Sequence, residues 1–177
     1  QQWGLKMQDD LMDAMDAVSS NPDLDIKRSC IVGASYGGYA AMVASFRDNS
    51  RFQCFVAISG ISDLPAMLRT DAAGDDTTKA IQKTYIGDYE HNRKPLDDAS
   101  AINHVAAIKK PMLLIHGVKD TQVSYKQSVE LYKALKRQGV AVSYLEQAEG
   151  THYFDTEFER TEAFAALETF LNKHLPR

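Results

Sequence analysis

The sequence predicts an α/β domain built on an open, mostly parallel sheet. Two apolar runs, 52–58 (FQCFVAI) and 111–117 (PMLLIHG), have the near-continuous hydrophobicity of strands that are buried on both faces. Helical patterns lie between such runs, and this alternation is typical of parallel strands joined by right-handed crossovers. The length of 177 residues, with 44% hydrophobic and 25% charged residues, suits one globular domain with its own core.

Each expected element is bounded by a turn signal. Residues 5–18 have apolar side chains at helical spacing, and the segment NPDLD (21–25) ends that helix. Gly139 has the position of the residue that follows a helix C-terminus. The long interval 60–110 exceeds a plain connection, and inserts of that length are often functional. We expect strands at 26–33, 52–58, 111–117 and 140–146, and helices at 5–18, from Tyr36 to about 46, at 124–138 and at 156–174.

Charge and hydropathy exclude several classes of partner. The formal net charge is −4 and no basic run stands out, so we expect no nucleic-acid partner. No apolar stretch approaches the roughly 18 residues of a membrane span, and no signal peptide is visible. Cys30 and Cys54 lie in apolar runs and are expected to be buried free thiols, which fits a reducing compartment. The compartment stays open, with the cytoplasm favoured over a periplasmic, secreted or membrane-anchored parent protein.

The segment IVGASYGGYA (31–40) carries the chemical signal. A strand, the pattern G-x-S-x-G and then a helix form a nucleophile elbow, which would expose Ser35 at the carboxyl edge of the sheet. We expect a Cβ at Gly33 or Gly37 to collide with neighbouring backbone, and Gly38 to let the helix pack closely. The backbone N–H of Tyr36 would lie at the helix start, where it can donate to an oxyanion.

A serine nucleophile needs a base and an acid that orients the base. In α/β-hydrolases these follow the serine in the order acid, then histidine. Asp120 follows one expected strand and His152 follows the next, so both should meet Ser35 at one sheet edge. Asp63 and Asp155 are rival acids that we interpret as helix-start residues, and for His116 we expect a structural or supporting role.

These residues together resemble a known family. The segments GASYGGYAAM (33–42), PMLLIHGVKDTQV (111–123) and EGTHYF (149–154) resemble the catalytic domain of the prolyl oligopeptidase family of serine peptidases. That family includes dipeptidyl peptidases, acylaminoacyl peptidases and oligopeptidase B. The segment WGLKMQDDLMDAMDAV (3–18) is similar to the part that precedes the nucleophile strand, so the resemblance extends over essentially the whole chain.

The resemblance implies an α/β-hydrolase fold and a serine peptidase that cleaves short peptides through an acyl-enzyme. Ser35 would be the nucleophile, His152 the base, Asp120 the acid, and the Tyr36 N–H one oxyanion donor. No cofactor is implied, and no cluster with metal-site spacing is present in the sequence. An esterase of the same fold remains the alternative, because its reaction is also acyl transfer.

The resemblance also implies a pocket for the substrate residue before the cleaved bond. In dipeptidyl peptidases the corresponding insert is rich in aromatic residues that hold proline, whereas ISDLPAMLRT (61–70) offers aliphatic side chains, so strict proline specificity is not expected. Core packing is the other role open to these aliphatic residues. The residues implied for the pocket rim are Tyr36, Ile61, Leu64, Met67 and Val123.

The family's earlier strands, its second oxyanion tyrosine and its β-propeller have no counterpart in the sequence. We therefore expect residues 1–177 to form one partial α/β-hydrolase catalytic domain, the C-terminal part of a larger enzyme. One side of the strand at 26–33 would then be unpaired, and such an edge invites pairing with a second copy. A truncated, non-catalytic fragment that self-associates is the alternative function for this piece.

Overall fold

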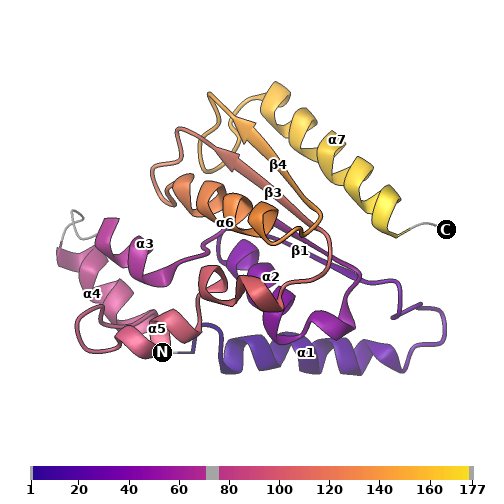
Figure 1. Cartoon of the computed structure of the whole chain (residues 1–177), viewed down its shortest axis with the longest axis horizontal. Helices are drawn as coiled ribbons and strands as arrows, with labels where there is room; N and C mark the ends of the chain where they lie inside the picture. The colour runs from indigo at the N-terminus through magenta and orange to yellow at the C-terminus, as the bar shows by residue number, and fades with distance from the viewer. Residues whose placement is uncertain (1, 71–75, 176–177) are drawn as a thin grey trace.

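The structure, a computed structural model, describes residues 2–70 and 76–175 and contains a four-stranded sheet with helices on both faces (Figure 1). The regular elements are, in chain order, α1 (Lys6–Ser19), β1 (Cys30–Ala34), α2 (Tyr36–Arg47), η1 (Asn49–Arg51), β2 (Cys54–Ile58), α3 (Leu64–Thr70), α4 (Asp76–Tyr85), α5 (Arg93–Asp98), η3 (Ala101–Ala107), β3 (Met112–Gly117), α6 (Lys126–Arg137), β4 (Val142–Gln147) and α7 (Glu157–His174).

All strand pairs are parallel, in the order β1-β2-β3-β4, so the predicted α/β architecture is confirmed. The strands and the main helices begin within four residues of their predicted positions. The largest difference is at β1, because residues 25–29 form a turn in which the Arg28 amide donates to the Asp25 carbonyl and the Ser29 hydroxyl donates to the Ile26 carbonyl. Gly139 follows α6 with φ of 73°, as its predicted place after a helix requires.

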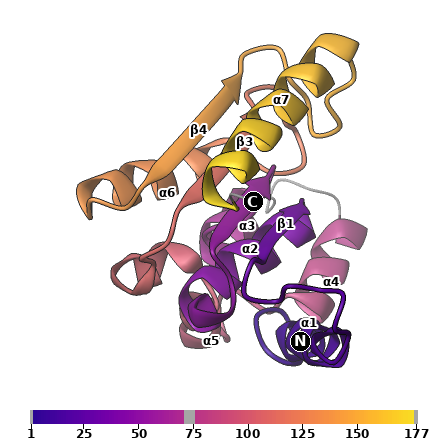
Figure 2. The same cartoon turned by 90° about the vertical axis from the view of Figure 1, so that its right-hand side faces the viewer.

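Alternate residues of the strands supply two cores. On one face, Phe55 and Leu114 pack with residues of α2 and α6. On the other face, Val56 and Ile115 pack with Ala163 and Phe170 of α7 (Figures 1 and 2). Burial of β2 and β3 on both sides explains why their sequences are continuously apolar.

The insert between β2 and β3 forms a third cluster. Its helices lie on the opposite side of the molecule from α7 (Figures 1 and 2). Leu64 and Leu96 of the insert are buried against Tyr39 and Val43 of α2. The insert therefore packs directly against α2, the helix that follows Ser35.

The two cysteines correct one prediction. Cys30 and Cys54 form a disulfide rather than two free thiols, with Cα atoms 4.7 Å apart. They are register partners on the neighbouring strands β1 and β2. Strand register is a long-range property that apolar composition does not reveal, so the argument for a reducing compartment from unpaired thiols fails.

A second correction concerns the start of α7. Thr156, not Asp155, caps this helix, because its side chain accepts from the Glu159 amide while the Glu159 carboxylate accepts from the Thr156 amide. The Asp155 carboxylate instead accepts from the Thr151 hydroxyl at 2.6 Å. Asp63 does cap α3, as predicted, by accepting from the Ala66 amide at 2.8 Å.

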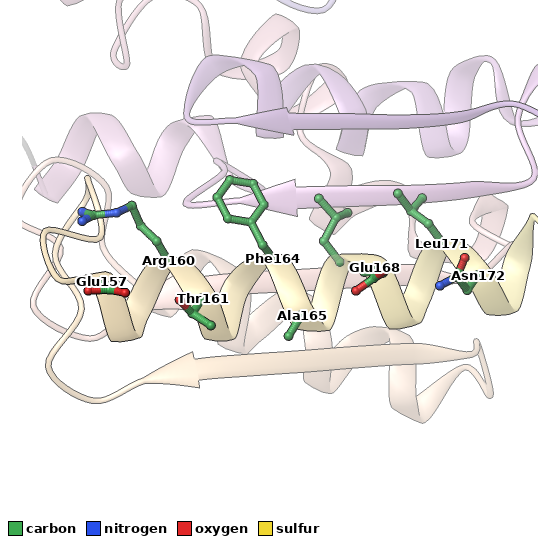
Figure 3. A pocket seen from close by; sticks show the side chains of 9 residues that line it. Glu157, Arg160, Thr161, Phe164, Ala165, Glu168, Leu171 and Asn172 are labelled. Carbon is green, nitrogen blue, oxygen red and sulfur yellow. The ribbon is translucent and has the colours of Figure 1, made fainter.

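The outer surfaces of β1 and α7 are partly apolar. Within the described residues β1 pairs only with β2, and Val32 of β1 is 42% exposed. A groove of about 810 Å³ runs along α7, and Figure 3 shows Arg160, Phe164 and Leu171 projecting from the same side of that helix. No helix in the described part of the chain is long and apolar enough to cross a membrane.

We expect the isolated 177-residue chain to self-associate through the unpaired side of β1, because free N–H and C=O groups beside an exposed valine favour strand pairing. Val32→Lys should shift sedimentation at high concentration toward the monomer, since a lysine on an edge strand opposes pairing. Thr169→Lys, on α7 and away from β1, is the matched control. Equal sedimentation of wild type and Val32→Lys would contradict this prediction.

Candidate active site

Ser35 occupies a strained turn between β1 and α2. Its φ of 56° lies in the left-handed region, which costs free energy for a residue with a side chain. A Cβ on Gly33 would lie 2.2 Å from the Gly37 carbonyl oxygen, and a Cβ on Gly38 would lie 2.9 Å from the Gly60 Cα. The elbow therefore depends on glycine at 33 and 38.

Gly37 departs from the prediction. A Cβ on Gly37 would meet no heavy atom within 4 Å outside its own neighbours and helix backbone. Residues 33 and 37 do approach closely, but the collision would come from a Cβ on residue 33, which would strike the backbone of residue 37. The tight turn thus depends on the position of the backbone of residue 37, and it does not require that residue 37 lack a side chain.

Tyr36 is the first residue of α2, and the first amides of a helix have no intrahelical acceptor. The Ser35 amide is already used, since it donates to the Ile58 carbonyl at 2.8 Å. The first intrahelical bond of α2 runs from the Tyr39 amide to the Ser35 carbonyl at 3.0 Å. The Tyr36 N–H, in the residue that follows Ser35, is therefore at the positive end of the helix dipole and has no acceptor within α2.

Asp120 lies in the loop after β3 and its side chain is buried. Its Oδ1 accepts from the backbone amides of Gln122 and Val123, both at 2.8 Å. Its Oδ2 lies 2.7 Å from His152 Nδ1 and 3.2 Å from His116 Nε2. Each of the two carboxylate oxygens thus has two hydrogen-bonding partners.

These contacts control the ionisation of Asp120. Burial acts to raise the pKa of the carboxyl group, because a charge is costly away from water. Hydrogen bonds from His116, the Val123 amide, His152 and the Gln122 amide outweigh burial and lower the pKa from 3.8 to about 2. The carboxylate is therefore ionised at neutral pH and faces the imidazole as an acceptor.

His152 lies in the loop after β4, and its side chain is only 9% exposed. Two glycines bring this loop against the loop of Asp120. A Cβ on Gly117 would lie 2.2 Å from the Gly150 carbonyl oxygen, and that same oxygen accepts from the Lys119 amide at 2.9 Å. The sequence interpretation missed this contact, although each glycine lies two or three residues before a candidate catalytic residue and was the available signal.

The structure joins the predicted acid and base directly. Because β1, β3 and β4 are parallel, Ser35, Asp120 and His152 all follow the carboxyl ends of strands at one edge of the sheet. Within residues 2–70 and 76–175, the Ser35 hydroxyl makes no hydrogen bond to the His152 ring. Such contacts are often long in free enzymes and shorten when substrate binds.

The five predicted pocket residues belong to one hydrophobic cluster. Ile61, Leu64 and Val123 are almost fully buried in it, while Tyr36 and Met67 are partly buried at its border. The two border residues also line an apolar pocket of about 580 Å³, together with Trp3, Met7 and residues of α4. Three of the five thus pack in the interior of the cluster, and two line a cavity, one of them Tyr36, the residue that follows Ser35.

No group of three or more potential metal-ligating side chains occurs in the described part of the chain. At the sheet edge lie a serine in a strained turn, a histidine and a buried carboxylate, which are the residue types that acyl transfer by a serine nucleophile requires.

Comparison with known proteins identifies the family of the chain. The model of the prolyl oligopeptidase family of peptidases matches residues 1–177. The chain belongs to the prolyl oligopeptidase family. The fold is accordingly that of the α/β-hydrolases: an acylaminoacyl peptidase from Pyrococcus horikoshii superposes with a TM-score of 0.87 at 25% identity, over 99% of this chain and 29% of that one.

Some relatives in the family are named as peptidases, whereas others are named as inactive. Dipeptidyl aminopeptidase BIII of Pseudoxanthomonas mexicana is 30% identical over 96% of this chain and 25% of its own length. Inactive dipeptidyl peptidase 10 of Rattus norvegicus is 29% identical over 74% of this chain and 15% of its own length. The chain spans about a quarter or less of the length of these relatives. Because the family includes a protein named as inactive, membership alone does not establish activity, and the residues of the site must be considered as well.

Proposed function

We propose that this chain carries the catalytic residues of a serine peptidase that cleaves short peptides through an acyl-enzyme. The observation that carries the proposal is the 2.7 Å contact between His152 Nδ1 and Asp120 Oδ2, at the sheet edge that the Ser35 elbow faces. An ionised carboxylate can only accept, so His152 Nδ1 holds the ring proton. The Nε2 lone pair is then left to act as the base.

In the proposed reaction, Ser35 Oγ attacks the carbonyl carbon of the peptide bond while His152 Nε2 takes the hydroxyl proton. The C–N bond then breaks, the imidazolium returns that proton to the leaving amine, and the acyl group stays on Ser35. Water, activated by the same imidazole, hydrolyses the ester and restores the serine. The Tyr36 N–H donates to the oxyanion in both halves of the reaction.

Two observations support peptide substrates with an apolar side chain before the cleaved bond. Relatives of the chain bear the names dipeptidyl aminopeptidase and acylamino-acid-releasing enzyme. Tyr36, the residue that follows Ser35, and Met67 line an apolar pocket. Ile61, Leu64 and Val123 are buried in the same hydrophobic cluster as these two residues. Such a lining excludes a charged side chain because its desolvation would be uncompensated.

The test is labelling of the whole protein with a fluorophosphonate, read by mass spectrometry of the peptide that contains Ser35. We expect His152→Ala to slow labelling about 10²–10⁴-fold, because the general base is lost. His91→Ala is the matched control, since the His91 side chain is exposed and its ring contacts the Asp88 carboxylate in the insert between β2 and β3. Equal labelling rates for wild type and His152→Ala would contradict the assignment of the base.

An esterase of the same fold is the alternative, because ester and amide hydrolysis use the same groups. Turnover of matched amide and ester substrates separates the two: comparable rates indicate a peptidase, and cleavage of the ester alone indicates an esterase. Failure of wild-type Ser35 to label would favour a non-catalytic role, as the name of the inactive relative illustrates.

A further inference from the structure

A second histidine contacts the carboxylate oxygen that faces His152. His116, the penultimate residue of β3, has a side chain with no exposed surface. Its Nε2 lies 3.2 Å from Asp120 Oδ2 and 3.0 Å from the Val123 carbonyl oxygen. The two imidazoles therefore share one oxygen atom of Asp120.

The surrounding groups define the tautomer of His116. Both partners of Nε2 are acceptors, so Nε2 must carry a proton. On the other side of the ring, Nδ1 lies 2.8 Å from the hydroxyl oxygen of Ser128, in the first turn of α6. The Ser128 hydroxyl can donate to this nitrogen when the proton of the ring is on Nε2. His116 thereby ties the end of β3 to the acid loop and to α6.

We propose that His116 is a positioning residue that locks the Asp120 carboxylate in the rotamer which presents Oδ2 to His152. The proposal rests on the function proposed above. The backbone amides of Gln122 and Val123 hold Oδ1, and because rotation about the Cβ–Cγ bond moves both oxygens together, a donor at the second oxygen, Oδ2, adds to the restraint on the whole carboxylate. The Nε2–H of His116 fixes that second oxygen.

The fixed oxygen matters most when His152 becomes an imidazolium, because the new positive charge is then stabilised by a carboxylate that need not reorient. A fixed acceptor also keeps His152 Nε2 aimed at the serine throughout the cycle. Both effects act in the transition state rather than in substrate binding, so kcat should depend on His116 while KM should not.

The experiment uses three variants of the whole protein. His116→Leu removes the donor, and we expect kcat for a peptide substrate to fall about 10–100-fold, the loss that is typical when a hydrogen-bond partner that orients a metal-ligating side chain is removed. His116→Gln places an amide N–H near the same position and should restore most of kcat. Ser128→Ala leaves His116 without its Nδ1 donor and should lower kcat severalfold with KM unchanged. His91→Gln is the control and should match wild type.

A spectroscopic readout follows the acid–base contact without turnover. The Nδ1–H proton of His152, observed by NMR after selective ¹⁵N-histidine labelling, should broaden or shift in His116→Leu and Ser128→Ala and should recover in His116→Gln. A structural role alone would leave this resonance unchanged in folded variants, or would deny rescue by glutamine.

Unchanged kcat in His116→Leu would overturn the proposal, as would a loss of kcat with an unaltered His152 resonance. If His116→Leu fails to fold, Ser128→Ala carries the test, because its wild-type kcat would overturn the proposal equally well. A wild-type protein that hydrolyses no peptide but whose His152 resonance still responds to Ser128→Ala would refute the proposed function and leave the positioning geometry supported.

Discussion

Asp120→Asn should lower kcat about 10⁴-fold while leaving the fold intact, the loss that follows when a catalytic imidazole is held in the wrong tautomer. The amide of asparagine has nearly the same shape as the carboxylate, so packing around the buried site should not change. What changes is the pattern of donors and acceptors around the side chain.

The hydrogen bonds around Asp120 determine which way the asparagine amide points. The Oδ1 position receives two backbone N–H groups, from Gln122 and Val123, and only an oxygen can accept them. The NH₂ group must therefore take the Oδ2 position and point at His152 and His116. His152 would then accept at Nδ1 and carry its proton on Nε2, where it could no longer take the proton of Ser35.

The measurement is kcat for a peptide substrate, together with the rate of fluorophosphonate labelling at Ser35. Asp155→Asn is the matched control, because Asp155 is the rival acid beside His152 and its carboxylate contacts Thr151 rather than an imidazole. We expect this control to change kcat little. A comparable loss in both variants would show that general destabilisation of the loop, and not the tautomer, lowers the rate.

Local patterns were sufficient to predict the elements of the fold. The strands β2 and β3 are buried on both faces, so their apolar runs were unambiguous, and Gly139 marked the end of α6. The roles of acid and base stay predictions, made because parallel strands place all their carboxyl ends at one edge. Chain order then selected Asp120 and His152 over the rival residues, and the structure joins these two directly.

Contacts between distant segments were not predictable in the same way. The disulfide between Cys30 and Cys54 depends on the register of two strands, which a spacing of 24 residues does not reveal. The contact of Gly117 with Gly150 and the bond between His116 and Ser128 likewise join separate elements. Each required the relative placement of β3, β4 and α6, which only the tertiary structure supplies.

The two glycines that flank Ser35 are expected to respond in opposite ways to alanine. In Gly33→Ala the new Cβ would lie 2.2, 2.3 and 2.8 Å from the O, C and Cα atoms of Gly37. All three atoms are backbone, so no side chain can rotate away, and the elbow or the start of α2 must move. We expect the free energy of unfolding to fall by about 3 kcal/mol or more, at or beyond the upper end of ordinary overpacking.

Gly37→Ala is the matched control within the same motif. Its Cβ would point into open space at the second residue of α2, where alanine favours the helix over glycine. Urea unfolding should therefore give Gly37→Ala a free energy equal to or slightly above that of wild type. If the two variants were destabilised equally, the motif glycines would be required for a shared backbone property, and the one-sided contact between residues 33 and 37 would not explain the elbow.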